Sequence, residues 1–228
     1  GHVVETDRLV RRVGHHREAE AAYHSAFELS GKQHNLLGQI YCLLGLAATA
    51  QESGDPAASA AYLDRAGTLM DPRAPSENPP RMSRALVLSR LPAQATAALI
   101  QGRLDIVAGR YGAARIQLGR AVADGHPAVV HSATLAITEM QLRTGDAKGA
   151  EENARRTLAR AIALQGGLQY STNTGHSYLK LARALHQLGD VEQARVALTS
   201  AVEHLSNTVD EEHPLLVHVV LHRAVHLG

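Results

Sequence analysis

Five turn glycines, each followed by the same order of small and bulky residues, constrain the fold more than any other feature of this sequence. A small residue follows each glycine at i+5, a bulkier one follows at i+9, and another small one follows at i+12. The copies begin at Gly14, Gly54, Gly109, Gly145 and Gly189, and the copy at Gly145 is the weakest. Glycine permits the tight or left-handed turn that ends a helix, and small residues let the next helix pack closely. The pattern therefore predicts a series of antiparallel helix pairs. We expect the residue after each glycine, an Asp or a basic residue, to cap the second helix.

The composition agrees with a helical fold. Of the 228 residues, 45% are hydrophobic but only 3% are aromatic, so a β-sandwich or barrel built on aromatic and β-branched strands is not expected. Upstream of Gly54 and Gly189, apolar residues recur three and four positions apart, as on the buried face of a helix. We therefore expect an all-α protein with enough apolar material for one core or one continuous array.

Together, the glycine pattern and the apolar helices before it resemble the tetratricopeptide repeat (TPR), a helix pair of about 34 residues. The resemblance implies a right-handed α-solenoid of about five such pairs plus a terminal helix, in a single domain over residues 1–228. The uneven spacing of the glycines excludes a strict 34-residue array. The Trp that the family carries in its first helix is absent, because the chain contains no Trp.

A proline-rich stretch interrupts the series between the second and third copies. Four prolines occur from Pro72 to Pro80, and proline lacks the backbone donor that a helix interior needs. We expect an irregular insertion over about residues 71–92. It would contain a long loop, a short helix over about 82–91 and a new helix start at Pro92.

In TPR proteins the first helix of each pair lines a concave groove that binds extended or helical peptide segments. Counting back from each glycine, the resemblance implies a groove whose cations outnumber its two anions, Glu52 and Glu139. We predict that the groove binds a protein or peptide of acidic character, held by leucine anchors and by arginines that can contact a carboxylate or phosphate through two hydrogen bonds. The predicted partner-binding residues are Arg8, Arg11, Arg12, Leu44, Leu99, Arg103, Leu135, Arg143, Leu179, Lys180, Arg183 and His186.

Catalytic chemistry is not expected, and neither is a cofactor. A glycine-rich phosphate loop and a dinucleotide fingerprint are absent from the sequence, and Cys42 lies among apolar residues, as a buried core thiol would. His218, His222 and His226 recur every four residues near the end of the chain, but no Glu completes a hydrolytic zinc motif. We predict no metal site, and this histidine stripe is the weak candidate for one.

Charge and cysteine content narrow the class of partner. Lys and Arg total 23 against 22 for Asp and Glu, which excludes a globally basic nucleic-acid binder, so nucleic-acid contact is not expected. The single cysteine excludes an intrachain disulfide, and no apolar run approaches the roughly 20 residues that span a bilayer. We expect a cytoplasmic protein without membrane contact.

Because the chain opens Gly1-His2 without an initiator Met, we also expect a fragment of a longer protein.

The Ala-, Arg-, Leu- and His-rich repeats, as in residues 181–190, look like the C-terminal repeat regions of actinobacterial transcriptional regulators. This resemblance implies a non-catalytic sensor or regulatory module, which binds a partner segment or a small-molecule effector and can form homo-oligomers. Two alternatives belong to other classes. One is a free-standing scaffold or oligomerisation module, and the other is a metal-binding protein that uses the histidine stripe.

Overall fold

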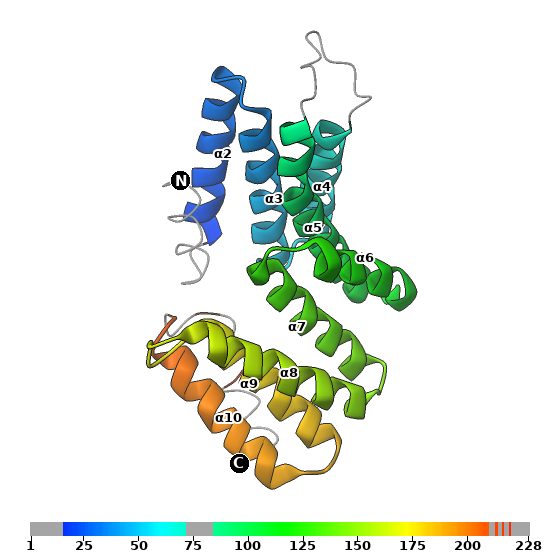
Figure 1. Cartoon of the computed structure of the whole chain (residues 1–228), viewed down its shortest axis with the longest axis vertical. Coiled ribbons are helices and arrows are strands. Elements are labelled where there is room, and N and C mark those ends of the chain that lie inside the picture. Colours follow the sequence, from blue (N-terminus) through cyan, green and yellow to red (C-terminus); the bar gives the residue numbers. More distant parts are fainter. Residues whose placement is uncertain (1–15, 72–83, 210–212, 214–215, 217–218, 220–228) are drawn as a thin grey trace. The chain divides into compact units, whose positions relative to one another are not determined.

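The computed structural model describes residues 16–71, 84–209, 213, 216 and 219, without the side chains of residues 84–91. Every regular element in these residues is an α-helix, which confirms the predicted all-α class (Figure 1). The helices are α2 (His16–Lys32), α3 (Leu36–Glu52), α4 (Pro56–Met70), α5 (Arg84–Val107), α6 (Tyr111–Asp124), α7 (Pro127–Arg143), α8 (Ala147–Gln165), α9 (Thr172–Gln187) and α10 (Val191–Ser206).

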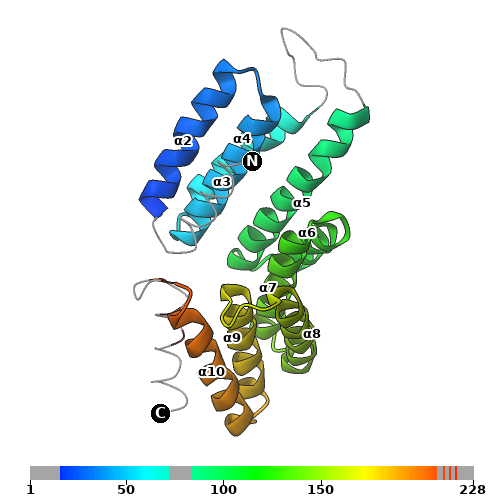
Figure 2. The same ribbon diagram turned by 60° about the vertical axis from the view of Figure 1, so that its left-hand side comes forward.

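The described residues fall into two compact units. The first unit runs to Val130 and contains α2 to α6, and the second starts at His131, inside α7, and contains the rest of that helix with α8, α9 and α10. Within the units, consecutive helices such as α5 and α6 or α9 and α10 run side by side (Figure 2). The single domain over residues 1–228, the TPR-type pairing and the right-handed solenoid stay predictions.

Four of the five turn glycines lie in three-residue turns between helices, and Gly14 lies outside the described residues. Gly54, Gly109, Gly145 and Gly189 have φ angles of 82°, 72°, 80° and 82°, in the left-handed region that favours glycine. Each glycine N–H donates to the carbonyl three residues earlier (3.0–3.4 Å), and the next N–H donates to the carbonyl five residues earlier (2.8–3.0 Å). This is the Schellman arrangement, which satisfies the last carbonyls of a helix. The predicted left-handed turns are confirmed at these four positions.

The residue after each glycine starts the next helix in two different ways. The side chains of Asp55, Asp146 and Asp190 accept the backbone N–H three residues on, at 2.9, 3.0 and 3.1 Å, and so cap α4, α8 and α10. At Arg110 the predicted cap is wrong, because its guanidinium instead contacts the buried carboxylate of Asp105, with Nη2 2.6 Å from Oδ1. Arginine offers only donors, and a helix start needs an acceptor.

The small residues after each glycine are buried between helices, as the spacing predicts. The i+5 and i+12 positions of the last four copies are at most 3% exposed. Two helix-interior glycines extend the same close packing: a Cβ at Gly45 would collide with the ring of Tyr23, and one at Gly102 would lie 2.7 Å from Leu118 Cδ2. Close approach of helix backbones therefore positions the side chains of each unit.

The predicted break at Pro92 is wrong. One continuous helix, α5, runs over Arg84–Val107 with Pro92 inside it, so the separate helix over 82–91 and the new start at Pro92 do not exist as such. An internal proline costs a helix about 3 kcal/mol, but many backbone hydrogen bonds on either side hold this 24-residue helix together. Thr96 Oγ1 also donates to the Pro92 carbonyl (2.9 Å). Of the predicted insertion over 71–92, residues 72–83 lie outside the described part of the chain.

Candidate functional site

Three cations surround one carboxylate in the second unit. Glu139 Oε1 accepts from Arg143 Nε at 2.9 Å, and Glu139 Oε2 accepts from Lys180 Nζ at 2.7 Å and from Arg183 Nη1 at 2.5 Å. Arg143 shares α7 with Glu139, whereas Lys180 and Arg183 come from α9. We call these four residues the Glu139 cluster.

Helix geometry explains how the cluster assembles. Arg143 follows Glu139 by four residues, so the two side chains lie on one face of α7, one turn apart. Lys180 and Arg183 are three residues apart on α9 and share a face for the same reason. Leu181, which lies between Lys180 and Arg183 in the sequence, is 5% exposed and belongs to the core of this unit. A further side chain, Gln187, donates from Nε2 to the Leu142 carbonyl (3.3 Å) and joins the ends of the two helices.

The cluster is partly withdrawn from solvent. The side chains of Lys180, Glu139 and Arg183 are 12, 18 and 24% exposed, and that of Arg143 is 46% exposed. Burial alone would raise the pKa of Glu139, but the charges and hydrogen bonds of Lys180 and Arg183 outweigh it and hold that pKa far below its ordinary value. Glu139 is therefore ionised at neutral pH.

Charge is not balanced within the Glu139 cluster. Among these four residues, one carboxylate faces three cationic side chains, an excess of two positive charges. Arg143 and Arg183 make no ion pair with any other carboxylate of the described residues. Because partial burial weakens solvent screening, this excess attracts anionic groups more strongly than the same charges would on an open surface.

Of the twelve predicted partner-binding residues, the structure brings three together: Arg143, Lys180 and Arg183. Arg103 lies half-buried on α5 in the first unit, and His186 lies half-buried on α9. The three N-terminal arginines, Arg8, Arg11 and Arg12, lie outside the described residues, as do the weak metal candidates His218, His222 and His226.

The four predicted leucine anchors pack inside the helix array. Leu44, Leu99, Leu135 and Leu179 are 2, 7, 4 and 1% exposed. Their burial accounts for their apolar character through packing alone, and the anchoring role stays a prediction that would require neighbouring helices to separate.

From the sequence, Glu139 was predicted only as one of two anions in a basic groove. That three cations would contact its carboxylate was not predicted. The spacing of Glu139 and Arg143 was the available signal, because opposite charges four residues apart pair on a helix. Nothing in the sequence links Glu139 to Lys180 and Arg183, which follow more than 40 residues later and meet it only through tertiary packing.

Other candidate chemistry is limited in the described part of the chain. Cys42 is buried in the core of the first unit at 7% exposure, which confirms the predicted core thiol. Within residues 16–71 and 84–209 and the three further described positions, no group of three His, Cys, Asp or Glu side chains could hold a metal ion. None of the described helices combines the length and the apolar character that crossing a membrane requires.

No family model matches the sequence, and comparisons with curated proteins and with solved structures find no match either. The resemblance to the tetratricopeptide repeat and to regulator repeat regions therefore rests on the sequence pattern and stays a prediction.

Proposed function

We propose that this protein is a non-catalytic helical binding module whose Glu139 cluster holds an acidic segment of a protein or peptide partner. The observation that supports this function is the convergence of Arg143, Lys180 and Arg183 on a single, partly buried carboxylate. Charge alone favours an anion here, and a second carboxylate would bring the local charge close to balance.

The cluster is suited to bind carboxylates because its cations are already positioned. Glu139 fixes the Arg183 guanidinium and the Lys180 ammonium before any partner arrives, so less side-chain entropy is lost on binding. Arg143, the most exposed member, offers a planar fork of donors that can hold a carboxylate through two hydrogen bonds. Lys180 adds a compact point charge next to Glu139.

A regulatory role follows from the resemblance of the repeats to those of bacterial transcriptional regulators. In that role, binding of an acidic partner would favour one arrangement of the helices and change their contacts with the rest of a longer protein. The support for this part of the proposal is the sequence resemblance alone.

The test uses a fluorescently labelled hexaglutamate peptide, with hexalysine as the opposite-charge control. We expect fluorescence anisotropy to show binding of hexaglutamate, which weakens as salt rises, and no binding of hexalysine. Lys180→Gln and Arg183→Gln should each weaken the affinity about tenfold, as expected for loss of one charge-assisted hydrogen bond.

Arg195→Gln is the matched control in the same unit. Arg195 lies on the exposed face of α10 and pairs with Glu192 (Nη2 to Oε1, 2.7 Å), so its loss removes one cation without touching the Glu139 cluster. If Arg195→Gln weakened hexaglutamate binding as much as Arg183→Gln, with equal helicity by circular dichroism, binding would reflect overall charge and the proposal would fail.

A further inference from the structure

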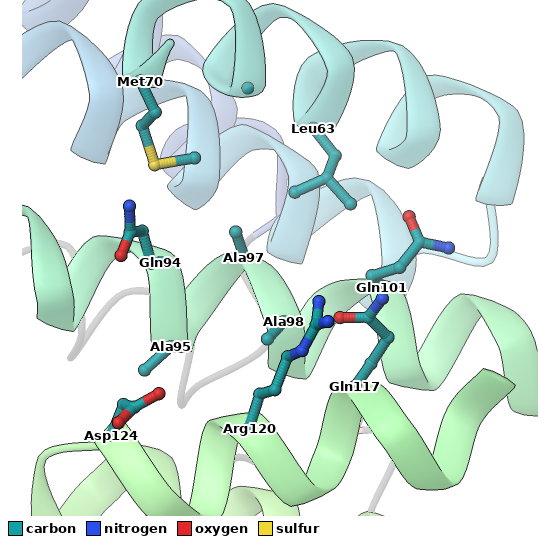
Figure 3. A pocket seen from close by; sticks show the side chains of 11 residues that line it. Leu63, Met70, Gln94, Ala95, Ala97, Ala98, Gln101, Gln117, Arg120 and Asp124 are labelled. Carbon is teal, nitrogen blue, oxygen red and sulfur yellow. The ribbon is translucent and has the colours of Figure 1, made fainter. Parts of the chain in front are cut away.

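A second site is suggested by a groove in the first unit, between α4, α5 and α6. Its volume is about 400 Å³ (Figure 3), within the range of roughly 300–1,000 Å³ that small-ligand sites occupy. Leu63 and Met70 reach into it from α4, and Ala95 and Ala98 line it from α5. These side chains give the groove an apolar floor.

Polar side chains stand around this floor with unused hydrogen-bonding capacity. Gln94, Gln117, Arg120 and Asp124 all line the groove, and none of the four makes a hydrogen bond or ion pair with another described residue. By contrast, the amide of Gln101 is engaged, because its Nε2 donates to Asp105 Oδ1 (3.2 Å). The four unpaired groups are therefore available to a ligand.

Two of these groups carry opposite charges on one face of α6. Arg120 and Asp124 are four residues apart, so their Cβ atoms lie about 5–6 Å from each other. They do not pair with each other: Arg120 extends toward Ala98 and Gln117, whereas Asp124 lies nearer Ala95 (Figure 3). The groove thus presents a separated cation and anion beside one apolar floor.

We propose that this groove binds a small zwitterion whose carboxylate and ammonium lie at the two ends of a short apolar body. The carboxylate would accept hydrogen bonds from the Arg120 guanidinium, and the ammonium would donate to the Asp124 carboxylate. The apolar body would cover Leu63, Met70 and the alanines, while the Gln94 and Gln117 amides can donate to one end and accept from the other. This site lies in the other unit from the Glu139 cluster and does not depend on it.

Ligands with a single charge fit the groove less well. An anion alone would leave Asp124 as a repulsive neighbour, and a cation alone would meet Arg120 in the same way. An α-amino acid holds its two charges on one carbon, so it would reach both groups only if Arg120 and Asp124 turned toward each other, whereas in this structure they extend apart (Figure 3). The separate directions of the Arg120 and Asp124 side chains therefore favour a longer zwitterion.

The probe for this site is 6-aminohexanoate, with hexanoate and hexylamine as singly charged controls of similar length. We expect 6-aminohexanoate to shift the amide NMR signals of α4, α5 and α6 saturably at millimolar concentration. The two controls should bind at least about tenfold more weakly, because each leaves one charged side chain without its partner.

Variants separate this site from unspecific binding. Arg120→Gln and Asp124→Asn should each weaken 6-aminohexanoate binding about tenfold. Gly67→Leu should weaken it: Gly67 lines the groove, and an added Cβ there meets no atom within 4 Å, so we expect the larger side chain to occupy space that the ligand would take. Gly119→Leu on α6 adds the same side chain at an equally open position that does not line the groove, and should leave binding unchanged.

Three results would overturn the proposal. One is the absence of saturable shifts with wild-type protein. Another is equal binding of hexanoate or hexylamine, which would show that the second charge contributes nothing. The third is equal binding by folded Gly67→Leu and Gly119→Leu variants, which would place the probe elsewhere.

Discussion

Glu139 on α7 and Arg183 on α9 face each other through two contacts, with Arg183 Nη1 2.5 Å from Oε2 and Nη2 3.4 Å from Oε1. These contacts join two helices through residues that lie 44 positions apart in the sequence. The pairing also keeps Glu139 on the same cations that the carboxylate of an acidic partner would contact, so Glu139 both orders these cations and competes for them.

Replacing Glu139 therefore has opposite effects on binding and stability. We expect Glu139→Gln to bind hexaglutamate more tightly than wild type, because the carboxylate that competes for the three cations is then absent. The same change should lower the free energy of unfolding by about 1–2 kcal/mol, because it removes the carboxylate with which these partly buried cations pair. Fluorescence anisotropy and urea denaturation measure the two effects.

The control for this prediction is Glu192→Gln, which removes an exposed carboxylate from α10. It should change both quantities little, because exposed ion pairs contribute weakly to stability. Weaker hexaglutamate binding by a folded Glu139→Gln variant would contradict the competing role of Glu139.

His131 should make the second unit sensitive to mild acid. The residue is 3% exposed, and burial, with a smaller contribution from the Arg160 charge, lowers its pKa from 6.5 to about 4. In the unfolded chain the ring protonates below about pH 6.5, but in the folded protein it stays neutral down to about pH 4. Its contribution to stability is thus complete above pH 6.5 and falls as the pH drops from 6.5 to 4, by up to about 3 kcal/mol.

Urea unfolding at a series of pH values measures this loss. A His131→Leu variant keeps a buried side chain of similar size without a titrating group, so its stability should depend less on pH over the same interval. Parallel pH curves for the wild type and this variant would show that His131 does not cause the sensitivity.

Replacing glycine by alanine should have opposite effects on stability in a turn and inside a helix. Gly189→Ala should destabilise the protein by about 1–2 kcal/mol, because Gly189 has a φ of 82°, which a residue with a Cβ adopts only with strain. Gly119→Ala lies inside α6 with open space around the new Cβ, and should stabilise by up to about 1 kcal/mol. Thermal unfolding followed by circular dichroism compares them, and a stabilising Gly189→Ala would refute the assigned turn.

Helix packing in the first unit can be tested at Gly45. A methyl group there collides with the Tyr23 ring, so Gly45→Ala should cost about 1–3 kcal/mol, as overpacking does. Shortening the neighbour should restore part of that loss: in the Tyr23→Leu background, adding Gly45→Ala should cost clearly less than in wild type. Equal costs in the two backgrounds, measured by a double-mutant cycle, would mean that the two residues do not contact.

Features that depend on a few neighbouring residues could be predicted from the sequence. The left-handed glycines, the aspartate caps at Asp55, Asp146 and Asp190, and the buried small residues all follow from backbone geometry and helical spacing, which act within about four residues. The all-α class followed from the repetition of these local signals. Pro92 is the exception, because the rest of α5 overrides a local break.

The contacts between charged residues on different helices could not be predicted in this way, because they depend on helix packing. Arg143, Lys180 and Arg183 could be named from the sequence, but their shared partner Glu139 depends on how α9 packs against α7. In the same way, residues far apart in sequence on α4, α5 and α6 form the groove that holds Arg120 and Asp124. Contacts of this kind are set by the packing of whole helices, to which each residue contributes only a small part, and no short motif encodes them.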